Sequence, residues 1–232
     1  MLIILAAFAV LAIVLASASI LPPRSHGSSG ITYSLTKGGF YLNSSNALIE
    51  LPVFHSNRTL VITYPVNSFG GYPAYTHAIS MGSYSNVIEY SFSAVWNTSS
   101  KSPYEFDDIY TFLATNVKSW NGEEIGITDD MRGSTGNGII KAYLQPANSN
   151  VAQTKVILFN NDRHMHNFKI LLSNNSVSFY VDGNYVIAIY SNQSLLGNTF
   201  YVVAGANRWA SANNFSADGY AMTISNMTIT EG

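Results

Sequence analysis

The chain has 232 residues, of which 47% are hydrophobic and 10% are charged, and its formal net charge is -2. Ordinary globular proteins have about 25% charged residues, so Ser, Thr, Asn, Gly and Tyr must form much of this surface. A nearly neutral chain without a basic stretch is not expected to bind nucleic acid. The absence of cysteine excludes disulfides and thiolate metal sites.

The N-terminal segment Met1–Leu21 is uncharged and contains neither Gly nor Pro. Its length is close to the roughly 20 residues of a helix that spans a bilayer, and residues 22–30, which begin with two prolines, are expected to form a linker. Three interpretations remain open: a signal peptide cleaved after the small residues at 16–18, a retained membrane anchor, or a helix that packs against copies of itself. The segment resembles a pilin helix in composition only.

Residues 31–232 consist of short alternating segments separated by Gly, Asn, Ser or Asp. About fourteen of these segments are typical of β-strands, and none has a helical period. One domain is expected over this range, because β-sandwiches reach this size as single units. The predicted fold is an all-β, antiparallel two-sheet sandwich preceded by one hydrophobic helix.

The clearest local pattern is a hairpin over residues 176–190, SVSFYV-DG-NYVIAIY. Asp182 and Gly183 suit the two central positions of a type I′ turn, which need positive φ angles. One apolar face of the hairpin is expected to comprise Val177, Phe179, Val181, Tyr185, Ile187 and Ile189.

The hairpin belongs to a longer stretch, HNFKILLSNNSVSFYVDGNYVIAIY, which is followed by TFYVVAGA and GYAMTISNMTI. The order of these segments resembles the C-terminal half of the concanavalin A-like lectin/glucanase sandwiches, including their laminin G-like members, over roughly residues 86–230. The resemblance implies a jelly roll of two large antiparallel sheets. It also implies a concave face whose rim loops bind carbohydrate or, in some members, cleave it.

Glucanases of this superfamily carry a Glu-x-Asp-x-x-Glu strand that places carboxylates on either side of a glycosidic bond. The nearest segment here is EIGITDD at 124–130, where Glu124 takes the first position and Asp129 the last. Gly126 replaces the middle aspartate, and Asp129 is shorter than glutamate. With two departures in one motif we expect no catalysis, and Glu124 and Asp129 are only weak catalytic candidates.

Metal binding has only weak candidates, and Ca²⁺ is the one cofactor left open. His164 and His166 are two residues apart, close to Asp162, and would share a face of a strand. Acidic pairs at 107–108 and at Asp129 and Asp130 offer the carboxylate oxygens that Ca²⁺ takes from loops.

Aromatic residues in polar sequence are the candidates for glycan binding, because their rings stack on the apolar faces of sugars. Trp120 and Trp209 lie in segments that predict loops, and Asn207 and Arg208 are placed to hydrogen-bond sugar hydroxyls. Trp96 ends an alternating strand and is expected in the core.

Asn-x-Ser/Thr sequons are spread along the chain, and several are expected to carry glycans if the host glycosylates exported proteins. Their asparagines are Asn43, Asn57, Asn97, Asn174, Asn192, Asn214 and Asn226.

Together these features predict an exported protein, extracellular or on the cell surface, without enzymatic activity. The first hypothesis is a subunit of a filament or coat, polymerised from copies of itself or anchored in a membrane through Met1–Leu21. A secreted or tethered lectin-like module that binds surface glycans is the alternative. A glycoside hydrolase with a degenerate site and a viral surface protein are weaker alternatives.

Overall fold

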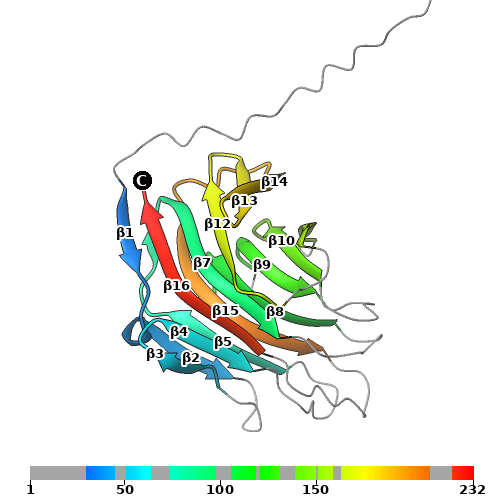
Figure 1. The fold of residues 1–232 in the computed structure, drawn as a ribbon. Coiled ribbons are helices and arrows are strands. Elements are labelled where there is room, and N and C mark those ends of the chain that lie inside the picture. Colours follow the sequence, from blue (N-terminus) through cyan, green and yellow to red (C-terminus); the bar gives the residue numbers. More distant parts are fainter. Residues whose placement is uncertain are drawn as a thin grey trace, which may run out of the picture.

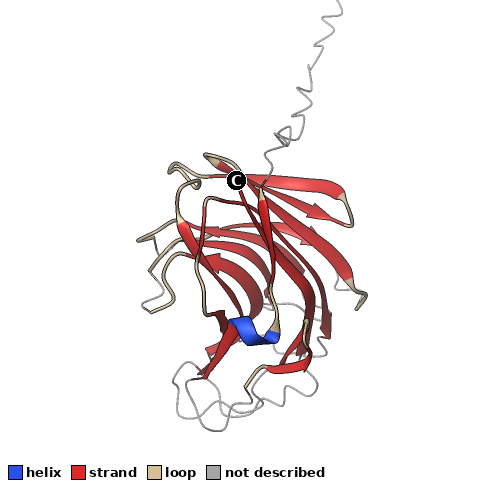
Figure 2. Ribbon diagram, turned by 90° about the vertical axis from the view of Figure 1, so that its left-hand side faces the viewer, coloured by secondary structure: helices blue, strands red, loops and turns tan. Residues whose placement is uncertain are grey.

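The computed structural model describes residues 30–44, 51–63, 74–97, 106–118, 121–130, 139–149, 151–158, 163–209 and 221–232. Two antiparallel sheets, each of eight strands, pack face to face as a sandwich (Figures 1 and 2). The only helix within these ranges is a single 3₁₀ turn, η1 (Lys37–Gly39). The predicted antiparallel two-sheet sandwich is therefore confirmed.

The first sheet, sheet A, runs in the order β14-β13-β12-β7-β16-β4-β3, and β1 pairs with the C-terminal half of β16. Its strands are β1 (Ile31–Ser34), β3 (Val53–Ser56), β4 (Thr59–Thr63), β7 (Val87–Asn97), β12 (His166–Leu172), β13 (Ser176–Val181), β14 (Asn184–Tyr190) and β16 (Ala221–Glu231).

The second sheet, sheet B, runs in the order β11-β10-β9-β8-β15-β5-β2, and β6 pairs with the start of β15. Its strands are β2 (Phe40–Ser44), β5 (Ala74–Ser80), β6 (Tyr84–Ser85), β8 (Phe106–Ala114), β9 (Glu124–Asp130), β10 (Ile139–Gln145), β11 (Gln153–Leu158) and β15 (Thr199–Trp209).

The main core lies between the two sheets, because successive side chains of a strand point to opposite faces and the apolar set points inward. Trp96 is fully buried there, as predicted, and its ring meets Phe168 edge-on. The hydroxyls of Tyr90 on β7 and Thr111 on β8 lie 2.6 Å apart, so a hydrogen bond crosses the core from one sheet to the other. This bond satisfies polar groups that would be costly to bury alone.

The predicted hairpin is present as β13 and β14, with Asp182 and Gly183 at φ angles of 50° and 80°. Val177, Phe179 and Val181 are buried in the core as predicted, and Ile187 and Ile189 pack against it. Tyr185 does not share this buried face. A register shift between Phe179 and Tyr180 places Tyr185 opposite Tyr180, on the outward face of sheet A.

The predicted N-terminal helix and linker lie, apart from Gly30, outside the described residues. Within the described ranges, no helix has the length and apolar character needed to cross a membrane.

Candidate functional site

The outward face of sheet B carries a second apolar cluster, separate from the core between the sheets. On β8, Ile109 and Leu113 point inward, so Tyr110 and Phe112 point outward and are nevertheless buried. They form this cluster together with Ile79, Ala114 and Val203. The centre of the outward face of sheet B is therefore shielded from water, whereas Tyr143 and Tyr201 at the cluster's margin stay partly exposed.

Three aromatic rings are stacked across this face. The ring centroids of Tyr110 and Phe112 lie 4.4 Å apart, and those of Phe112 and Tyr143 lie 4.8 Å apart. Phe112 and Tyr143 flank Gly126 in register from β8 and β10. Because two strands separated by a third are about 9.6 Å apart, rings this close must meet above Gly126.

Gly126 is required at this position. A Cβ atom there would lie 2.1 Å from the backbone oxygen of Thr111 and 2.5 Å from Cδ1 of Phe112. The middle aspartate of the glucanase motif has no room at residue 126 while this aromatic stack is in place.

Glu124 is the one carboxylate that the structure describes on this face of β9, and its side chain is 7% exposed. It lies directly opposite Gln145 on β10. The hydroxyl of Tyr143 donates to Oε1 of Gln145 at 2.6 Å and also hydrogen-bonds Glu124. Burial raises the pKa of Glu124 to about 7, and the hydrogen bond with Tyr143 offsets only part of this rise.

The neighbouring Glu123 points to the other side of the chain. It is buried as well, its Oε2 accepts from Nδ2 of Asn198 at 2.8 Å, and burial raises its pKa. Of the two glutamates, Glu124 is the one that lies on the outward face of the sheet.

A polar cluster on the same face joins β5, β8 and β15. Nε2 of His77 lies 2.5 Å from the hydroxyl of Tyr110 and 3.2 Å from Oδ1 of Asn207. The Tyr110 hydroxyl donates to the same Asn207 oxygen at 3.0 Å, and the ring of Tyr75 stacks on His77. Burial lowers the pKa of His77 to about 4, so the imidazole is neutral at ordinary pH.

The predicted catalytic pair is not assembled. Strand β9 keeps an unbroken register with β8 and β10, so residues 124 and 129, an odd number apart, lie on opposite faces. Asp129 is fully buried on the inward side with Ile125 and Ile127. Thr128 is the residue that shares the outward face with Glu124.

Of the four predicted glycan-binding residues, the structure places one, Asn207, in contact with other residues of the site. Asn207, Arg208 and Trp209 lie in strand β15 and not in a loop, and adjacent residues of a strand point to opposite faces. Asn207 belongs to the His77 cluster. The side chains of Arg208 and Trp209, and all of Trp120, lie outside the described part of the chain.

The acidic pairs and histidines occupy strands and strand ends. Residues 107–108 and 129–130 lie in β8 and β9, not in loops. Asp162 and the side chains of residues 107, 108 and 130 are outside the described part. His164 precedes β12 and is exposed. Among the described residues, no group of three or more His, Asp or Glu side chains is arranged to hold a metal ion.

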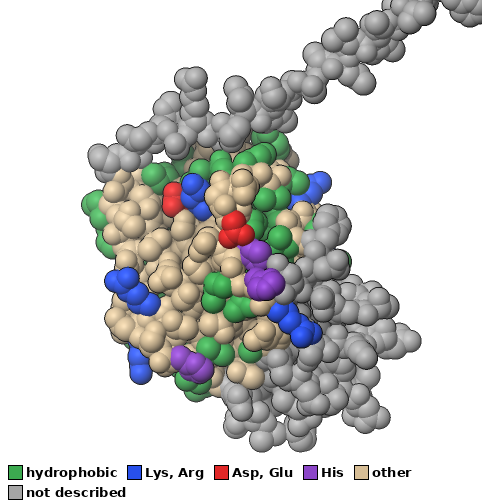
Figure 3. Space-filling model, viewed as in Figure 1, with side chains coloured by type: hydrophobic (Ala, Val, Ile, Leu, Met, Phe, Trp, Pro, Cys, Tyr) green, Lys and Arg blue, Asp and Glu red, His purple; other side chains and the backbone are tan. Residues whose placement is uncertain are grey.

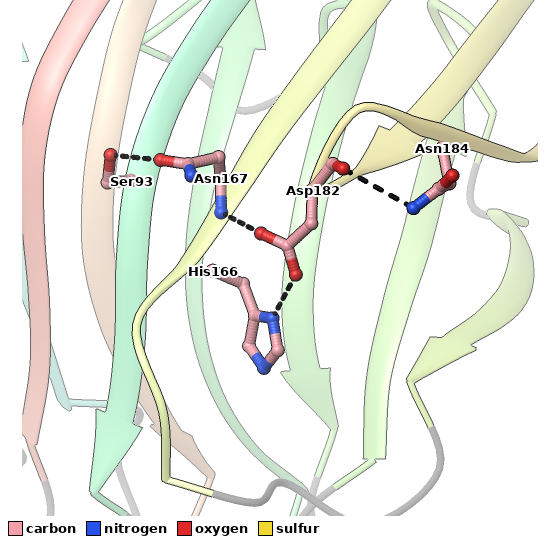
Figure 4. A network of polar contacts seen from close by, with 5 residues as sticks. All are labelled: Ser93, His166, Asn167, Asp182 and Asn184. Atoms are coloured by element: carbon pink, nitrogen blue, oxygen red, sulfur yellow. Dashed lines mark hydrogen bonds and ion pairs between the residues drawn. The ribbon is translucent and has the colours of Figure 1, made fainter.

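His166, the first residue of β12, is held by the turn of the β13–β14 hairpin. Its Nδ1 atom lies 2.6 Å from Oδ2 of Asp182, and Oδ1 of the same carboxylate accepts the backbone N–H of Asn167 at 2.9 Å (Figure 4). Asn167 in turn accepts a hydrogen bond from Ser93 at 2.7 Å. These contacts fix the turn to the sheet.

The sequon asparagines that the structure describes are all exposed, and Asn214 lies outside the described residues. The exposed set is Asn43, Asn57, Asn97, Asn174, Asn192 and Asn226.

Several residues of this face carry no motif in the sequence. His77 lies in β5, a segment that is not among the strands predicted from the sequence. Tyr143 and Gln145 lie on a predicted strand without a distinguishing feature. Their spacing by two residues puts them on one face, but only the pairing of β9 with β10 brings them to Glu124.

No protein-family model matches the sequence, and no curated protein matches it significantly. Among solved structures, the β-glucanase of Bacillus licheniformis is similar with a TM-score of 0.58 and 12% identity, over 89% of this chain and 99% of that one. A Bacteroides ovatus family GH16 protein, in complex with a mixed-linkage glucan product, has a TM-score of 0.60 and 10% identity, over 86% and 99%. The endo-β-1,3-glucanase of Pyrococcus furiosus has a TM-score of 0.58 and 12% identity, over 86% and 90%.

These likenesses establish the fold of the chain as the concanavalin A-like jelly-roll sandwich, in agreement with the resemblance seen in the sequence. They contradict the expectation of a non-enzymatic filament or coat subunit, because the β-glucanase and the endo-β-1,3-glucanase named above share this fold over most of their length. At about 10% identity the likeness covers the fold alone, so the activity must be argued from the residues of the site.

Proposed function

We propose that this protein acts on a neutral polysaccharide, which it binds across the outward face of sheet B and cleaves with Glu124 as the proton donor. The observation that carries the proposal is a buried carboxyl group, with a pKa of about 7, on this face. The glucanase fold of the structural neighbours supports the same assignment.

The chemistry follows from the protonation state of Glu124. A carboxyl group with a pKa near the working pH keeps its proton long enough to donate it to a departing glycosidic oxygen. The retaining mechanism would require a second carboxylate about 5 to 5.5 Å away, and the next outward positions on β9 are Gly126 and Thr128. The proposal therefore makes Glu124 the acid and water the nucleophile. The glycosidic C–O bond breaks as Glu124 protonates the leaving oxygen, the attacking water loses its proton to solvent, and Glu124 regains a proton from solvent.

The surroundings of Glu124 suit an uncharged ligand. Burial keeps His77 neutral, and the groups around it are a hydroxyl, an amide and aromatic rings. Lys141 of β10 shares this face but lies opposite Thr128, four residues along β10 from Gln145. Such groups hydrogen-bond sugar hydroxyls and stack on sugar rings without requiring a charge on the ligand.

The test is release of reducing ends from mixed-linkage β-glucan and β-1,3-glucan by the purified protein. Glu124→Gln keeps the shape of the side chain and removes the acidic carboxyl proton, so the rate should fall about 10²- to 10⁴-fold, the usual contribution of a general acid. Glu89→Gln, on the outward face of sheet A, is the matched control and should retain the rate. No activity of the native chain on either glucan, or equal rates for the native chain and Glu124→Gln, would overturn the proposal.

Export to the cell exterior is a further part of the proposal. The uncharged segment Met1–Leu21 and the exposed sequon asparagines support it. N-terminal sequencing and the mass of the native protein before and after glycosidase treatment test it, and an unglycosylated protein retained in the cytoplasm would contradict it.

A further inference from the structure

We infer that the outward face of sheet A carries a second glycan-binding surface, a tyrosine platform formed by Tyr180, Tyr185 and Tyr190 on the β13–β14 hairpin. It would bind a neutral polysaccharide chain without cleaving it. This hairpin forms one edge of sheet A (Figure 1). Glu124 belongs to the other sheet, so the two proposed surfaces are on different sheets.

The platform is built from the register of three strands. Lys169 on β12, Tyr180 on β13 and Tyr185 on β14 lie in one row across the sheet. Nζ of Lys169 lies 4.9 Å from the centroid of the Tyr180 ring, and the rings of Tyr180 and Tyr185 meet edge to face at 5.6 Å. The cation and the ring contact hold this end of the platform in place.

Tyr190 forms the other end of the platform. It lies opposite Ser176, four residues along β13 from the row of Tyr180, which corresponds to about 13 Å at the rise of a strand. Its side chain is 56% exposed and that of Tyr185 is 37% exposed, so both rings can be reached from solvent.

The floor between the two ends is formed mainly by small and apolar side chains. Ser178 and Ala188 lie opposite each other there, with Leu171 of β12 alongside. The Ser178 side chain is 1% exposed, and its hydroxyl has no hydrogen-bond partner among the residues that the structure describes. Because this hydroxyl is shielded from solvent, a ligand on the platform would contact the tyrosine rings and not the Ser178 hydroxyl.

These features favour a polysaccharide over a protein partner. A protein interface needs a continuous apolar core, whereas here exposed rings are separated by Ser and Ala. A long sugar chain presents repeated flat apolar faces edged by hydroxyls, which match tyrosine rings placed at intervals along a strand. Charged side chains on the face of the molecule seen in Figure 3 are sparse and of both signs, which suits a neutral ligand.

The experiment measures binding of the full chain to microcrystalline cellulose and to insoluble β-1,3-glucan, in a Glu124→Gln background so that no ligand is cleaved. Replacement of both exposed rings, Tyr185→Ala with Tyr190→Ala, should weaken binding about tenfold, as expected for the loss of two stacking contacts. Tyr33→Ala is the matched control, since Tyr33 is a tyrosine of similar exposure (38%) on the distant strand β1.

A second variant separates loss of stacking from loss of structure. Tyr185→Phe with Tyr190→Phe keeps both rings and should bind as the parent does, and thermal unfolding of each variant shows whether it is folded. Equal binding by the double alanine variant and the parent, or no binding of the parent to either polysaccharide, would overturn the platform. Because the readout is binding alone, this result does not depend on whether Glu124 supports hydrolysis.

Discussion

The two outward faces of the sandwich are made from the same alternation of side chains, yet their polar groups are in different states. On sheet A, hydroxyls such as those of Thr32 and Thr230 lie 3.0 Å apart in an exposed setting. On sheet B, Glu124 and His77 are buried beside aromatic rings, and their pKa values move to about 7 and about 4. The burial of their side chains is what shifts the pKa values of Glu124 and His77.

The largest effect is expected where the backbone of sheet B is closest to the aromatic stack. Gly126→Ala would place a Cβ atom against the Thr111 carbonyl and the Phe112 ring, so we expect a loss of about 3 kcal/mol or more in the free energy of unfolding. Chemical denaturation measures it. Gly82→Ala is the control, because nothing lies within 4 Å of its added Cβ; equal losses in both variants would be inconsistent with a tight stack.

The next effect tests the burial of Glu124. Its folded pKa of about 7 exceeds the ordinary value of 4.5, so the folded state binds the extra proton and this contribution to stability is lost as the pH rises from 4.5 through 7. Between pH 4 and pH 8 the native chain should lose roughly 3 kcal/mol relative to Glu124→Gln. Urea denaturation of both proteins at the two pH values measures the difference, and parallel pH curves would contradict the burial.

His77 should change the stability in the opposite direction as the pH changes. Its folded pKa of about 4 lies below the ordinary 6.5, so the unfolded chain takes up the proton first and stability falls as the pH drops below 6.5. From pH 7.5 to pH 5 the native chain should lose roughly 2 kcal/mol that a His77→Gln variant does not lose. NMR of the imidazole ring supplies a direct check, because a charged ring at pH 5 in the folded protein would refute the assignment.

The smallest effect is expected on sheet A. Thr230→Val removes the exposed contact with Thr32 and should change the free energy of unfolding by less than about 0.5 kcal/mol, as is usual for surface positions. Denaturation under the conditions used for Gly126→Ala measures it. A loss as large as that of Gly126→Ala would erase the contrast between the two faces.

The sequence predicts less of the candidate site than of the fold. Alternation marks Glu124 as the start of a strand, but the proposed pairing with Asp129 ignores that an odd separation places two residues on opposite faces. The polar character of residues 207–209 predicts a loop, whereas pairing with β5 and β8 makes this segment the end of a strand. In both cases partner strands distant in sequence decide the geometry.

By itself, the sequence determined the all-β class, the type I′ turn at Asp182 and Gly183, and the burial of Trp96. These depend on local backbone preferences and on alternation, which act within a few residues. The tertiary structure alone decided which carboxyl group is buried, why Gly126 has no side chain, and that His77 meets Asn207. Each of these depends on rings and strands brought together from distant parts of the chain, and on the loss of water that follows.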